Sequence, residues 1–167
     1  RGDVVLMRIG NWHVLIAALE FAIREPRLYN QQCWTRIADC GTVRCIAGWI
    51  AHFGGWVDDA PINSFSGGDV FTVSNSQHQK VVIEHAALMS LSLDPEYYGE
   101  IKPLDYDTWV DDESQLGTEA EILAHHLFAG GRRFEDILST VRDLAHADGV
   151  TLPDVILDEM AKYGVPA

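Results

Sequence analysis

C-G-T-V-R-C-I-A-G-W, residues 40–49, is the most specialised stretch of this 167-residue chain. Thr42 is placed to act as a helix N-cap, because its hydroxyl can accept from the backbone N–H groups two or three residues later. Apolar side chains then recur at the helical period, at Ile46, Trp49, Ile50 and Phe53, and Gly54-Gly55 provides a helix stop. The stretch therefore predicts a helix over about residues 43–53.

The cysteines around this helix leave three interpretations open. Burial beside a tight turn is favoured, since free cysteine is among the most buried residue types. A disulfide would leave one of the three cysteines unpaired. Zinc is the third interpretation, but the C-x6-C-x4-C-x6-H spacing lacks the short intervals of known zinc knuckles. Its candidate ligands are Cys33, Cys40, Cys45 and His52. We therefore expect no metal and no other cofactor.

The rest of the chain predicts a mainly α, single-domain bundle of about six helices over residues 1–167, with at most a minor strand pair. Residues 1–10 are expected to form an N-terminal arm, and residues 54–76 a long irregular insertion. Short strands are predicted near residues 4–7 and 70–73, and an irregular connection over 27–41. The longer helices are expected at 11–25, 43–53, 76–91, 119–129 and 134–147, and from residue 151 or 153 to 163. A short helix is expected at 95–101, after Asp94.

Charge is distributed unevenly along the chain, whose formal net charge is −13. Residues 1–50 carry six basic and four acidic groups, whereas residues 51–167 carry six basic and twenty-one acidic groups. Such a field repels a phosphate backbone, so direct nucleic-acid binding is not expected unless Arg24, Arg27, Arg36 and Arg44 gather on one face. Solubility alone explains many acidic surfaces, and a basic protein partner is the alternative.

The densest acidic segment surrounds two aromatic residues. Its candidate partner-binding residues are Asp105, Tyr106, Asp107, Trp109, Asp111, Asp112 and Glu113. Aromatic rings supply contact area and carboxylates steer a basic partner, so such a segment can form an interaction hot spot. An exposed loop whose tryptophan packs into its own core is the competing interpretation. Asp58, Asp59 and Asp69 match no calcium loop and are expected to be solvated.

Histidines near carboxylates give only weak catalytic hypotheses. Glu121 and His125 are four residues apart with His126 beside them, but Glu121 is already used in a T-x-x-E capping box with Thr118. The chain contains no nucleophile elbow, phosphate-binding loop or complete metal motif. We therefore do not expect this protein to be an enzyme, and we assign no catalytic residues.

The motif C-G-T-x-x-C-x-A-G-W resembles the signature of a family of small, mostly uncharacterised proteins of bacteriophages, actinobacteria and other bacteria. The preceding Pro26, Tyr29, Gln31 or Gln32, and Trp34 fit the same pattern. Residues 85–93 fit it loosely, with serine at position 90 or 92 where the family has glycine. The resemblance implies a phage or prophage origin and supplies no activity, cofactor or catalytic residue.

Together these observations favour a small acidic interaction protein, acting in the cytoplasm (the host cytoplasm if phage-encoded) as a monomer or homodimer. It would bind a host or phage protein, a basic one being a candidate, through its acidic, aromatic-containing surface. No apolar run is long enough to span a membrane, and residues 1–9 lack the apolar core of a secretory signal. A small-molecule or nucleotide-binding module using Arg36 or Arg44 is the first alternative, and a metal-dependent enzyme the second.

Overall fold

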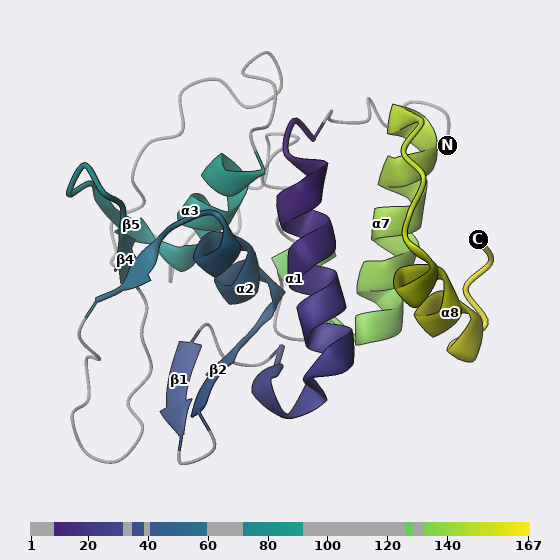
Figure 1. Cartoon of the computed structure of the whole chain (residues 1–167), viewed down its shortest axis with the longest axis horizontal. Helices are drawn as coiled ribbons and strands as arrows, with labels where there is room; N and C mark the ends of the chain where they lie inside the picture. The colour runs from purple at the N-terminus through teal and green to yellow at the C-terminus, as the bar shows by residue number, and fades with distance from the viewer. Residues whose placement is uncertain (1–8, 32–34, 39–40, 60–71, 92–125, 129–131) are drawn as a thin grey trace, which may run out of the picture.

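Helices dominate the part of the chain that the computed structural model describes, which comprises residues 9–31, 35–38, 41–59, 72–91, 126–128 and 132–167. The prediction of a mainly α fold with a minor strand component is confirmed (Figure 1). The elements are α1 (Trp12–Arg24), the 3-10 turn η1 (Pro26–Leu28), β1 (Thr35–Ala38), β2 (Gly41–Arg44), α2 (Ile46–Phe53), β3 (Val57–Asp58), β4 (Thr72–Ser74), β5 (Lys80–Val82), α3 (Ile83–Ser90), α7 (Phe134–Asp148) and α8 (Asp154–Lys162).

Helix α1 lies at the centre of the fold, with α2 and α3 on one side and α7 and α8 on the other (Figure 1). Its inward face is apolar because valine, leucine and alanine recur at the helical spacing. These side chains pack into one core with apolar residues of the other helices. The largest fully buried members include Leu15, Leu19, Ile46, Ile50, Ile83, Ile137, Leu138, Ile156 and Met160.

Two small antiparallel sheets flank α2. Strands β1 and β2 form a hairpin in which Thr35 pairs with Arg44 and Ala38 with Gly41. The second sheet has the order β3-β4-β5, with Val57 opposite Ser74 and Val73 opposite Val81. Val73 and Val81 are buried in the core, so this sheet is anchored by one apolar pair and contributes little of the fold's hydrophobic interior.

The predicted start of the second helix was wrong. Thr42 lies in β2, where it pairs with Ile37, and the helix begins only at Ile46. Cys45 is the N-cap residue, with extended backbone angles, and its Sγ accepts a hydrogen bond from Gly48 N at 3.4 Å. β-branched Thr42 and Val43 favour an extended chain once a partner strand is available. The same hairpin corrects the prediction of an irregular connection over residues 27–41.

The predicted helix over residues 76–91 was wrong in its first half. Asn75 closes a turn there, since its Oδ1 accepts from the backbone N–H groups of Gln77 and Gln79. The chain then forms β5, and helix α3 starts at Ile83. Pairing of β5 with β4 gives Val81 a buried position in extended structure, which outweighs the helical spacing of the apolar residues here.

Other helix boundaries agree with the sequence. Helix α1 follows Asn11 and stops before Pro26, and α7 ends at Gly149, whose φ of 67° is left-handed. Asn11 directly precedes α1, but its side chain makes no cap hydrogen bond and instead donates to Ser90 O at 3.0 Å. Asp148 Oδ2 accepts from Ile9 N and from Trp12 Nε1, tying the start of the described chain to α7.

Several predicted segments lie outside the described residues. These are the strand near 4–7, residues 70 and 71 of the second predicted strand, the short helix at 95–101, and most of the predicted helix at 119–129, of which residues 126–128 are described and helical. Strands β3 and β4 fall within the predicted irregular insertion at 54–76. No helix in the described ranges combines the length and apolar character needed to cross a membrane.

Candidate functional site

Arg44 is the most unusual polar residue in the described structure, because it is only 7% exposed although it carries a permanent charge. It stands at the end of β2, immediately before the N-cap of α2. Its Nη2 lies 2.7 Å from Asp58 Oδ2 on β3, so the ion pair joins the hairpin to the second sheet. Arg44 Nε is also buried and has no hydrogen-bond partner among the described residues.

Trp49 completes the environment of this ion pair. The guanidinium carbon of Arg44 lies 4.6 Å from the centre of the Trp49 ring, a cation–π geometry. The indole Nε1 donates to Leu28 O at 2.9 Å, which fixes the ring against η1. Because Asp58 neutralises Arg44 and Trp49 covers it, the charge is held inside the protein and is not presented to a ligand.

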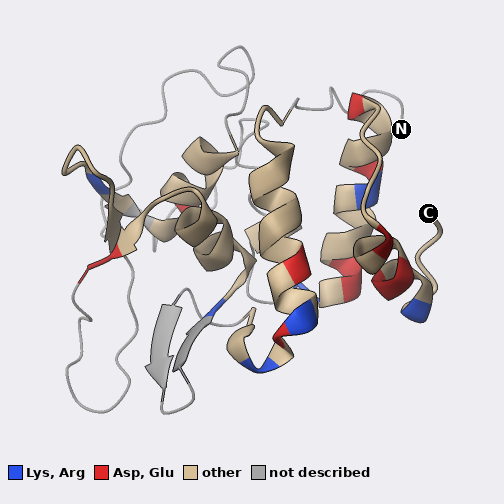
Figure 2. Cartoon of the chain, in the orientation of Figure 1, with Lys and Arg blue, Asp and Glu red and all other residues tan. Residues whose placement is uncertain are grey.

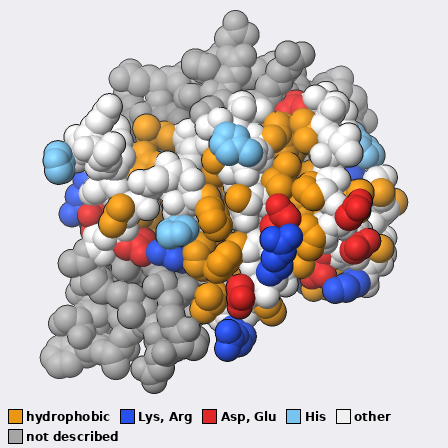
Figure 3. All heavy atoms as spheres, viewed as in Figure 1, with side chains coloured by type: hydrophobic (Ala, Val, Ile, Leu, Met, Phe, Trp, Pro, Cys, Tyr) orange, Lys and Arg blue, Asp and Glu red, His pale blue; other side chains and the backbone are white. Residues whose placement is uncertain are grey.

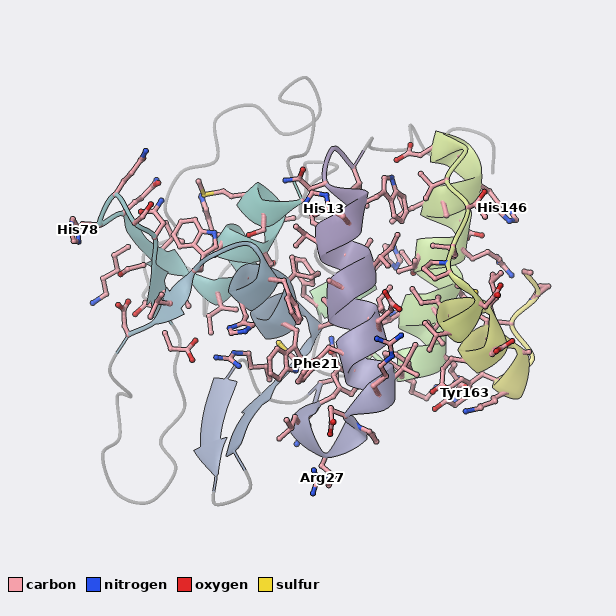
Figure 4. All side chains as sticks on the ribbon, viewed as in Figure 1. His13, Phe21, Arg27, His78, His146 and Tyr163 are labelled. Carbon is pink, nitrogen blue, oxygen red and sulfur yellow. The ribbon has the colours of Figure 1, made fainter. Side chains whose placement is uncertain are left out.

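An aromatic cluster extends from Trp49 to the surface. Phe21 of α1 lies 4.2 Å from Trp49 and 5.8 Å from Phe53 between ring centres. His52 packs edge-on against both Trp49 and Phe53, at 5.4 and 5.3 Å. Figure 4 shows Phe21 on the side of α1 that faces α2. Phe53 is 39% exposed, so the cluster has a buried base and an exposed rim.

The environment of His52 favours the neutral imidazole. Burial against the aromatic rings lowers the pKa of His52, and the nearby positive charge of Arg44 lowers it further, while Asp58 opposes the change. A neutral imidazole both donates and accepts a hydrogen bond. His52 is therefore suited to a polar contact at the edge of an apolar surface.

A second polar group lies on the sheet β3-β4-β5. Asp59 Oδ1 accepts from Ser74 Oγ at 2.9 Å, and Lys80 Nζ lies 3.9 Å from Asp59 Oδ2. The prediction that Asp58 and Asp59 are simply solvated was therefore wrong, since each is mostly buried and paired with a side chain of another strand. Asp69 lies outside the described residues.

Gln31 connects three parts of the core. Its Oε1 accepts from Tyr29 Oη at 3.0 Å and from Ile46 N at 3.2 Å, and its Nε2 donates to Leu127 O at 3.0 Å. Burial, together with nearby Cys45 and Tyr163, raises the pKa of the Tyr29 phenol far above its ordinary value. Tyr29 therefore stays protonated and donates to Gln31, which makes this network structural.

The candidate zinc ligands are not brought together where the structure describes them. Cys45 is buried at the start of α2, whereas His52 is exposed in its last turn. Seven residues of helix separate them by about 10 Å, whereas ligands of one zinc ion lie only about 2.0–2.3 Å from the metal. Cys33 and Cys40 lie outside the described residues. Among the residues that are described, no three His, Cys, Asp or Glu side chains could hold one metal ion.

All seven candidate partner-binding residues at positions 105–113 lie outside the described residues, as do Glu121 and His125. His126 is described and exposed. Arg44 was weighed from the sequence as a ligand contact and as one of four arginines of a nucleic-acid surface, and its pairing with Asp58 was missed. The spacing of Arg44 and Asp58 in the sequence does not predict their ion pair, because it forms between β2 and β3, on either side of helix α2.

Comparison of the chain with models of protein families, with curated proteins and with solved structures found no match.

Proposed function

We propose that this chain is a protein-interaction protein that binds a basic protein partner through its acidic surface. The observation that carries the proposal is the concentration of negative charge after residue 50. Residues 92–125 include ten acidic side chains and one lysine, and residues 132–167 include seven acidic and four basic side chains. Aromatic residues lie within the first of these segments, at Tyr106 and Trp109, and supply the anchors that acidic side chains alone do not.

The described part of the acidic surface lies on α7 and α8 (Figure 2). Asp143, Asp154 and Asp158 are exposed there. Long-range attraction toward a positively charged partner raises the rate of association and weakens as salt screens it. The resemblance of residues 40–49 to phage proteins supports a phage origin, and action in the host cytoplasm follows as part of the same proposal.

The competing small-molecule or nucleotide-binding function receives less support from the described residues. Its support in the sequence is the long insertion beside an aromatic-rich turn, with Arg36 or Arg44 as the ligand contact to test. The Arg44 guanidinium is paired with Asp58 and covered by Trp49. The Arg36 side chain is not described.

The test is affinity capture from a bacterial lysate, followed by titration of the identified partner with purified protein. One variant neutralises the proposed anchor segment (D105N, D107N, D111N, D112N and E113Q), and a control neutralises Asp143, Asp154 and Asp158 on α7 and α8. We expect the first variant to weaken binding at least about tenfold, the control to weaken it less, and the wild-type affinity to fall as salt rises. Partner binding that is unchanged in the first variant, or insensitive to salt, would overturn the proposal.

A further inference from the structure

We draw no further inference here: the strongest candidate, the partly exposed cluster of Phe21, His52 and Phe53 where apolar side chains gather over α1 and α2 (Figure 3), carries none because nothing in the described residues shows what covers it.

Discussion

The Arg44 guanidinium and the Asp58 carboxylate lie 2.7 Å apart and are both largely removed from solvent. They come from β2 and β3, the strands that immediately precede and follow α2. Their ion pair therefore closes a loop around this helix, with the Trp49 ring of the same helix stacked against the guanidinium. Removing either charge should show how much this ion pair contributes to the stability of the fold.

Asp58→Asn should destabilise the fold by about 1–3 kcal/mol, because it leaves the buried Arg44 charge without its carboxylate. Urea denaturation measures the change in the free energy of unfolding. Replacing both partners, as Arg44→Met with Asp58→Leu, should cost less than Asp58→Asn alone, since no unpaired charge remains. Arg24→Met is the control: it breaks the exposed pair with Glu20 and should change stability by less than about 1 kcal/mol. Equal losses of stability in Arg24→Met and Asp58→Asn would contradict this account of the Arg44–Asp58 pair.

Gly54→Ala should destabilise the contact between the end of α2 and α3. A Cβ at position 54 would lie 2.6 Å from Ser90 Cβ and 2.1 Å from Ser90 Oγ. Ser90 cannot easily withdraw, because its hydroxyl donates to Ala86 O at 2.7 Å. We expect a loss of about 1–3 kcal/mol, measured by thermal or urea unfolding.

A second substitution identifies Ser90 as the cause. Ser90→Gly removes both clashing atoms and should recover part of the stability lost in Gly54→Ala, less the roughly 1 kcal/mol that glycine costs within a helix. Ser90→Ala keeps the Cβ and should recover much less. Equal recovery by the two substitutions would show that the Oγ atom alone is responsible.

Gln31→Leu should destabilise the protein by at least about 2 kcal/mol, because it removes hydrogen bonds to Tyr29 Oη, Ile46 N and Leu127 O together. Tyr29→Phe, which removes one of these bonds, is the matched control and should cost about 1 kcal/mol. Hydrogen exchange of the Ile46 amide should accelerate in Gln31→Leu and remain slow in Tyr29→Phe. Unchanged protection of this amide in Gln31→Leu would argue against Gln31 as the connection.

The pKa of His52 should lie below its ordinary value of 6.5, chiefly through burial and then through Arg44. The unfolded chain then binds a proton at this site more readily than the folded chain, so His52 destabilises the fold as pH falls below about 7. The stability of His52→Gln should therefore decline less between neutral and mildly acidic pH. An NMR titration of the His52 imidazole measures the pKa directly, and a value at or above 6.5 would refute the assignment.

Three helices were predicted well from the sequence, and most of the short strands were not. Helices α1, α7 and α8 were predicted close to their observed bounds, because their apolar residues recur at the helical period and Pro26 and Gly149 mark their ends. Strands β1, β2, β3 and β5 were missed. Each is only two to four residues long, and a strand of that length is stabilised by its partner, which a local pattern does not contain.

For the candidate site around Arg44 and Trp49, the sequence could predict the individual residues but not how they come together. Trp49, Phe53 and Phe21 are recognisable as apolar positions of two amphipathic helices, but their meeting depends on how α1 packs against α2. The pairing of Arg44 with Asp58 depends on a hairpin and a strand that no periodicity predicts.

The amino-acid sequence by itself determined the helical class, the ends of its longest helices and the concentration of negative charge after residue 50, because these properties depend on residue type and on spacing within one turn or one segment. Only the tertiary structure decided that Cys45 rather than Thr42 begins α2, that Arg44 is neutralised by Asp58, and that Phe21 of α1 packs against Phe53 of α2. Each of these depends on contacts between residues distant in the chain, and their energies arise from burial and pairing that exist only after the elements have packed.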